Sequence, residues 1–153
     1  MKVSRERRLG VSLGSAIRLL DECPEDILGT DELSVELFGF EISHDVKVAV
    51  GELIVVAEPL EVAVLPFRIE AGSGAEVFPV LDAELEVMPT SECGIALTLD
   101  GAYRPPGGLL GEAVDRLALG HVARDAIDRY FDRVVDRIRR GSASLDALEG
   151  VPV

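Results

Sequence analysis

Residues 81–140 read LDAELEVMPTSECGIALTLDGAYRPPGGLLGEAVDRLALGHVARDAIDRYFDRVVDRIRR and contain two hydrophobic periods. In residues 81–87, apolar side chains take every second position and acidic side chains take the others. This alternation is typical of a strand with one face on a core and the other in water. After the Pro-Pro-Gly-Gly sequence at 105–108, apolar residues recur about every 3.6 positions. The segment therefore predicts strands, a turn and then one long helix over 109–140.

The alternation continues outward from this segment. It recurs in residues 63–69 and again from Cys93 to Leu99, and turn-forming residues lie at 72–74 and 89–91. Short turns of this kind predict antiparallel neighbours. Leu33–Ile42 and Val46–Val56 also have the character of strands, although 53–56 is apolar throughout. We expect an α+β protein with an antiparallel sheet of about six or seven strands.

The N-terminal thirty residues predict two short helices. Ser12 or Ser15 can cap a helix that runs through Leu20, because a hydroxyl there accepts an unpaired backbone amide. Pro24 fits the first position of a second helix, and Gly29 fits its end. Residues 3–9 carry too many charges to be predicted as a strand.

The long helix is expected to end at Gly141, a residue that favours the left-handed C-terminal cap. No repeat or low-complexity linker interrupts the chain. We therefore predict one domain over residues 1–141, followed by a short tail over 142–153.

Composition limits the partners. The 153 residues include 15 basic and 28 acidic side chains, a net charge of −13, which disfavours nucleic acid and anionic membranes. No apolar run approaches the roughly 18 residues of a membrane span, and no apolar segment of a secretory signal follows the N-terminus. We expect a cytoplasmic protein in which Cys23 and Cys93 are free, buried thiols. The excess of Arg over Lys is typical of GC-rich bacterial genomes. Oligomeric state stays open, a homodimer included.

No motif predicts a metal or a cofactor. His44 and His121 have no partner at metal-ligand spacing, and no nucleophile motif of the G-x-S-x-G type occurs. The glycines at 107–111 precede the helix but lack the Lys-Ser/Thr of a phosphate loop, so they predict a tight turn. The carboxylates in 82–86 share the outer strand face and are interpreted as solvated charge.

A family resemblance lies in the second half of the chain. Its residues are LTLDGAY at 97–103, PPGGLLG at 105–111, DRL at 115–117, HVA at 121–123 and YF at 130–131. Residues 80–140 thereby resemble the last strand and terminal helix of START-like proteins, the superfamily that includes bacterial polyketide cyclases. The resemblance implies the helix-grip fold, in which a curled antiparallel sheet surrounds the long C-terminal helix and encloses an apolar cavity.

In such a cavity three polar residues are candidates for ligand contact. Tyr103 has the parity of the inward strand positions, Arg124 lies on the apolar stripe of the helix, and His121 precedes it by one turn. The apolar candidates are Phe67, Leu85 and Leu97. Small-molecule pockets commonly combine apolar walls with a few polar groups of this kind.

Three functions remain open. The preferred hypothesis is a binder or carrier of an apolar molecule such as a lipid, polyketide or isoprenoid. The first alternative is an enzyme of the cyclase/aromatase type, which needs a titratable group in the cavity, and Tyr103 and His121 are the candidates. The second alternative is an interaction protein whose core is filled.

Overall fold

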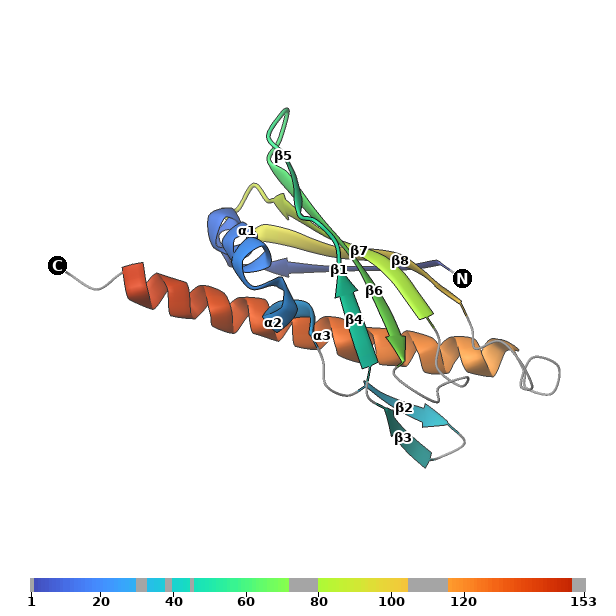
Figure 1. Cartoon of the computed structure of the whole chain (residues 1–153). Coiled ribbons are helices and arrows are strands. Elements are labelled where there is room, and N and C mark those ends of the chain that lie inside the picture. The colour runs from blue at the N-terminus through green and yellow to red at the C-terminus, as the bar shows by residue number, and fades with distance from the viewer. Residues whose placement is uncertain are drawn as a thin grey trace.

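The computed structural model describes residues 2–29, 33–37, 40–44, 46–71, 80–104 and 116–149 (Figure 1). Their elements are β1 (Lys2–Leu9), α1 (Leu13–Glu22), α2 (Pro24–Leu28), β2 (Leu33–Leu37), β3 (Phe40–His44), β4 (Val46–Val50), β5 (Ile54–Val56), β6 (Val62–Ala71), β7 (Val80–Pro89), β8 (Ile95–Arg104) and α3 (Arg116–Glu149).

One antiparallel sheet of six strands dominates the fold. Its order is β1-β8-β7-β6-β4, and β5 also pairs with β6, next to β4 along the same edge. β2 and β3 form a separate hairpin. The sheet lies over the long helix α3, and α1 and α2 lie at one end of the interior (Figure 1). This arrangement confirms the predicted α+β helix-grip class.

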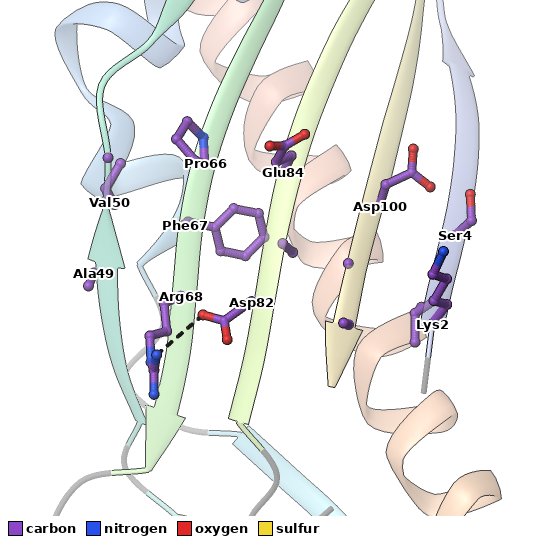
Figure 2. A pocket seen from close by; sticks show the side chains of 15 residues that line it. Lys2, Ser4, Ala49, Val50, Pro66, Phe67, Arg68, Asp82, Glu84 and Asp100 are labelled. Atoms are coloured by element: carbon purple, nitrogen blue, oxygen red, sulfur yellow. Dashed lines mark ion pairs between the residues drawn. The ribbon is translucent and has the colours of Figure 1, made fainter. Parts of the chain in front are cut away.

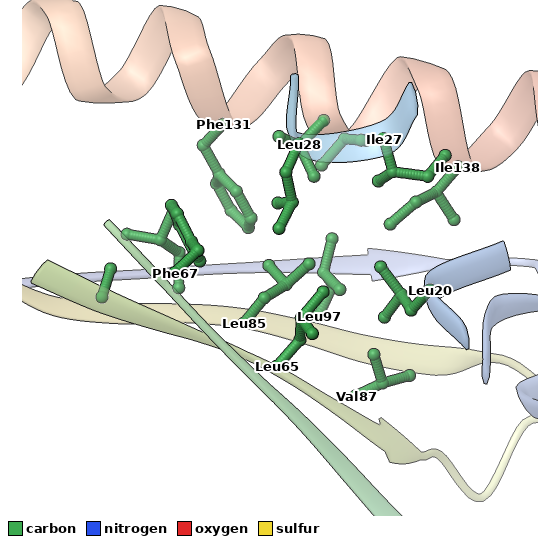
Figure 3. Close-up of a cluster of buried hydrophobic side chains, with 14 of the residues drawn as sticks. Leu20, Ile27, Leu28, Leu65, Phe67, Leu85, Val87, Leu97, Phe131 and Ile138 are labelled. Atoms are coloured by element: carbon green, nitrogen blue, oxygen red, sulfur yellow. The ribbon is translucent and has the colours of Figure 1, made fainter. Parts of the chain in front are cut away.

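The core lies in the layer between the sheet and α3. Alternate residues of β6, β7 and β8 point into it, as the period of two predicts, and α3 contributes one face (Figure 3). The largest fully buried side chains are Tyr130, Phe131, Leu20, Leu28, Leu65, Leu85, Ile95, Leu97, Leu99, Ile138, Val87 and Val134.

The prediction for residues 3–9 was wrong, because they form strand β1. β1 pairs with β8 along its whole length, and Val3 and Leu9 are buried.

Between Val3 and Leu9, two arginines of β1 reach α3. Arg5 pairs with Asp128, and the guanidinium of Arg7 lies 3.5 Å from the carboxylate of Asp132. The Arg7 guanidinium also lies 5.8 Å from the ring centroid of Phe131. The arginine stems therefore cover the border of the core, and the charged heads protect an edge strand.

The two short helices form as predicted. The Ser12 hydroxyl accepts a hydrogen bond from the amide of Ser15 at 3.2 Å and caps α1. Pro24 is at the start of α2, and Gly29 is its C-cap.

The strands between residues 33 and 56 are shorter than the sequence predicts. Leu33–Ile42 contains β2 and the start of β3, and Val46–Val56 is divided into β4 and β5. The division lies opposite Pro66 in β6, which has no N–H to donate to a neighbouring strand. The separation between these two segments was expected at Ser43-His44-Asp45, but Ser43 and His44 form the end of β3, and Asp45 is outside the described residues.

Two further corrections concern residues 93 and 141. Both cysteines are free thiols, but Cys23 is only half-buried, and Cys93 is exposed in the turn before β8, where its φ is 65°. α3 continues through Gly141 to Glu149, so residues 142–149 of the expected tail are helical. A Cβ at position 141 would lie 2.8 Å from Cδ2 of Leu19, so the missing side chain lets α1 pack closely on α3. Residues 109–115 of the predicted helix are outside the described residues.

Replacement of Phe131 by alanine should lower the free energy of unfolding by about 3–5 kcal/mol, because its ring is fully buried between sheet and helix. Urea denaturation measures this change. The matched control is Arg129→Ala on the exposed face of the same helix, which should change stability by less than about 0.5 kcal/mol. Equal effects of the two substitutions would contradict this packing of the helix on the sheet.

A Gly-to-Ala pair tests the close approach of β7 and β8. A Cβ at Gly101 would lie 2.7 Å from both the Ala83 Cβ and the Asp82 carbonyl oxygen, so Gly101→Ala should destabilise by about 1–3 kcal/mol. Gly14→Ala in α1 meets nothing within 4 Å and should stabilise by up to about 1 kcal/mol through helix propensity. Thermal unfolding of each variant shows whether its melting temperature rises or falls. A change in the same direction for both variants would contradict the prediction.

Candidate functional site

The inner face of the sheet changes character toward the end where β8 finishes. One cross-strand row there consists of Ile69, Leu81 and Tyr103. The adjacent row contains Phe67, followed by Ala83 and Gly101. Two of the small residues of the inner face, Ala83 and Gly101, thus share a row with Phe67, next to the row of Tyr103.

At this end of the interior the positive charge of Arg124 acts on Tyr103. Tyr103 is only 3% exposed, and its burial raises the pKa of the phenol, an effect that the positive charge of Arg124 partly opposes. Arg124 itself is exposed, so the prediction that it lies on the buried stripe of the helix was wrong. Its helix position lies at the margin of the packed face, where the long stem lets the guanidinium reach water. The pair therefore combines a buried hydroxyl with a charge at the boundary of the apolar interior.

The other predicted site residues are distributed along the core. The Phe67 ring packs against Tyr130 with centroids 6.1 Å apart. Leu85 and Leu97 are fully buried further along the sheet, among residues of the main hydrophobic cluster (Figure 3). His121 lies on α3 one turn before Arg124, and its side chain is outside the described residues. Of the predicted site residues, Tyr103 and Phe67 thus lie on adjacent cross-strand rows, and the charge of Arg124 acts on Tyr103.

Two polar residues that the sequence did not single out join α3 to α2. The Tyr130 hydroxyl donates a hydrogen bond to the Leu28 carbonyl at 2.8 Å. Arg137 donates to the carbonyls of Ile27, at 3.2 Å, and of Gly29. These contacts satisfy carbonyls that the end of a short helix leaves without intrahelical partners. Tyr130 and Arg137 are seven residues apart, so they lie on one face of α3. The sequence around them does not indicate that their acceptors are backbone carbonyls near the end of α2.

A second feature lies on the outer face of the sheet, away from α3. It is an open hollow of about 940 Å³ that extends from β4 across β6, β7 and β8 to β1 (Figure 2). Arg68 lies 3.5 Å from Asp82 within it. Glu84 and Asp100 are directly opposite each other on β7 and β8, and both carboxylates are exposed. The hollow is therefore lined by three carboxylates, of Asp82, Glu84 and Asp100, and by the two cations Lys2 and Arg68.

The described ranges contain no group of three or more His, Cys, Asp or Glu residues placed to hold a metal ion. Among the helices of those ranges, none combines the length and the hydropathy that crossing a bilayer requires.

Comparison with known proteins supports the fold. Neither a family model nor a curated protein matches the sequence. A hypothetical protein from Helicobacter pylori superimposes with a TM-score of 0.55 at 12% identity, over 93% of this chain and 88% of that chain. A conserved protein from Geobacillus kaustophilus gives 0.54 at 18% identity, over 92% and 96%. The structure of Ara h 8.0201 gives 0.49 at 11% identity, over 92% and 98%. The first two similarities show that the fold occurs in other solved proteins.

Replacement of Tyr130 by phenylalanine should destabilise the protein by about 1–3 kcal/mol at pH 8, because the buried Leu28 carbonyl loses its donor. Burial raises the pKa of Tyr130 well above the ordinary value of 10, although Arg137 opposes part of the shift. The folded state therefore holds this proton more tightly than the unfolded state, and the stability tied to it declines as the pH rises above about 10.

The difference in unfolding free energy between wild type and Tyr130→Phe should consequently be smaller at pH 11 than at pH 8. Chemical denaturation at the two pH values measures it. A difference that grows with pH would show that the hydroxyl is not buried in its neutral form.

Proposed function

We propose that this protein binds and carries an apolar small molecule in its interior, between the sheet and α3, at the end where Tyr103 lies. The observation that carries the proposal is the Tyr103–Arg124 pair at the border of an otherwise apolar layer. A ligand with a hydrocarbon body and an oxygen-bearing end suits this combination. Lipids, polyketides and isoprenoid acids share that chemistry.

Each predicted site residue has a role in this proposal. Phe67, Leu85 and Leu97 supply apolar contact, directly or through the residues that they support. The Tyr103 hydroxyl donates a hydrogen bond to the oxygen end of the ligand, and the Arg124 guanidinium pairs with a carboxylate there. His121, one turn earlier on α3, is proposed as a further polar contact.

The same residues favour binding over catalysis. A raised pKa keeps the Tyr103 phenol protonated at neutral pH, so it acts as a donor and not as a general base. A cyclase-type enzyme would have to take its base from elsewhere, and His121 is the candidate in this sequence. Membership of the START-like superfamily and a cytoplasmic, bacterial setting belong to the same proposal.

A filled core is the competing interpretation. The described residues around Leu85 and Leu97 pack closely, without polar groups, which favours a stable scaffold at that end. Under this alternative the protein acts only through its surface, and no apolar ligand enters it.

Binding of cis-parinaric acid, a fluorescent fatty acid, distinguishes these functions. Wild type should bind it, with and without EDTA, and Arg124→Met should weaken binding by about tenfold or more, because a charge-assisted hydrogen bond to the carboxylate is lost. Affinity for the methyl ester should change little in the same variant. Tyr103→Phe should weaken binding of both ligands.

The matched control is Arg129→Met, which removes an exposed guanidinium from the same helix. Thermal unfolding shows whether any variant has lost stability instead of a ligand contact. Native mass spectrometry of the purified wild type tests for a co-purifying molecule. Absence of binding to both the acid and the ester would establish the filled-core alternative.

A further inference from the structure

The outer face of β5 and β6 carries an apolar stripe. It consists of Ile54 and Val56 on β5 and of Val62, Val64 and Pro66 on β6. Ile54 pairs with Val64 and Val56 with Val62, so these four side chains lie on one face of the sheet. The intervening residues of β6 point to the buried inner face, where Ala63 and Leu65 are at most 1% exposed. The stripe therefore belongs to the face away from α3.

This region is the main concentration of exposed aliphatic side chains in the described part of the chain. The large hydrophobic residues that are exposed in the described part of the chain are Ile54 (56%), Val55 (45%), Val56 (49%), Leu60 (54%) and Leu148 (74%), and of these Val55 pairs with Ala63 and has the parity of the inner face. All but Leu148 lie within residues 54–60, in the β5–β6 hairpin that projects from the sheet (Figure 1). Clusters of exposed apolar side chains, unlike single ones, commonly mark interaction sites.

An acidic row runs beside the stripe on β7. Glu86 is directly opposite Val64, and Glu84 is directly opposite Pro66. On its other side, Glu84 is opposite Asp100, so two carboxylates are neighbours on adjacent strands. Within the described residues, no ion pair involves Glu84 or Glu86. In this respect the two glutamates differ from Asp82, which lies 3.5 Å from Arg68.

We propose that this outer face is a docking surface for a basic, amphipathic segment of another protein. The apolar side of the segment covers the stripe, and its Lys or Arg residues lie over Glu84 and Glu86. Figure 2 shows Pro66 of the stripe and Glu84 of the acidic row on this face. The hollow of about 940 Å³ continues from Pro66 toward β1 and gives the segment room. This surface is on the opposite side of the sheet from the interior, so the inference is independent of the proposed ligand-binding function.

The charge pattern selects this partner over two others. A second copy of the chain would bring its own acidic row and a net charge of −13 to the same place, and the like charges would repel. A small molecule in the open hollow would stay largely in water, whereas small-molecule sites bury most of their ligand. A basic segment with one apolar side meets both the stripe and the acidic row.

The test uses a fluorescein-labelled 14-residue peptide of leucine and lysine, arranged so that the leucines share one helix face. A peptide of the same composition, scrambled so that no face is apolar, is the probe control. Fluorescence anisotropy should show binding of the amphipathic peptide by the wild-type protein, weakening with added salt, and at least fivefold weaker binding of the scrambled peptide.

Two double variants remove the two parts of the surface separately. Ile54→Thr/Val56→Thr keeps β-branched residues on β5, and Glu84→Gln/Glu86→Gln removes the charges of the row. Each should weaken binding by about tenfold, and the second should also reduce the salt dependence. The matched controls are Leu148→Thr and Asp125→Asn/Asp136→Asn, exposed residues of α3 that should leave the affinity unchanged within twofold.

Amide chemical shifts of the wild-type protein locate the peptide without any substitution. Shifts concentrated in β5, β6 and β7 support the proposal, and shifts centred on α3 overturn it. It is also overturned if wild type does not bind, if both double variants bind like wild type, or if the scrambled peptide binds equally. Stripe-dependent self-association in sedimentation velocity, or stripe-dependent binding to phosphatidylcholine vesicles, would assign the surface to a second copy or a membrane instead.

Discussion

The fold depends on burial of one face of α3 against the concave inner face of the sheet. Phe131 and Val134 on the helix are fully buried there, opposite the alternating apolar residues of β6, β7 and β8. A sheet of this kind has one apolar face, and a single long helix covers it together with the two short helices at one end. α1 and α2 are secured to the same helix, the first through Leu19 beside Gly141 and the second through Tyr130 and Arg137.

The same contact explains where charge is tolerated near the core. Arg5 and Arg7 occupy inward positions of β1, yet each guanidinium reaches a carboxylate on α3. At the other margin of the helix, Arg124 reaches solvent and lies near the buried phenol of Tyr103. Long arginine stems can extend over apolar surface while their heads stay solvated or paired. Polar groups therefore border the interior without interrupting its packing.

The two faces of the sheet offer different chemistry. The inner face is apolar, and two of its small residues, Ala83 and Gly101, lie in the row of Phe67 and one row from Tyr103. The outer face combines an aliphatic stripe on β5 and β6 with carboxylates on β7. A carrier that loads an apolar ligand on one side and docks a basic partner segment on the other would use both faces without overlap.

The sequence alone established those features that depend on local chemistry. The period of two predicted β6, β7 and β8, the period of 3.6 predicted α3, and Ser12 and Pro24 predicted where α1 and α2 begin. In the candidate site, the alternation along β8 was sufficient to identify Tyr103 as an inward-facing residue, and its side chain is buried. These signals lie within one strand or one turn of helix, so periodicity and capping chemistry are enough to find them.

Other features required the three-dimensional arrangement. β1 carries too many charges to be recognised by its pattern, and it becomes a strand through pairing with β8 and ion pairs to α3. Gly141 does not end α3, because packing against Leu19 outweighs its capping preference. The proximity of Tyr103 to Arg124, and of the apolar stripe to Glu84 and Glu86, depends on strand register and on the curl of the sheet. Residues far apart in sequence meet only through these long-range pairings, and no local period encodes them.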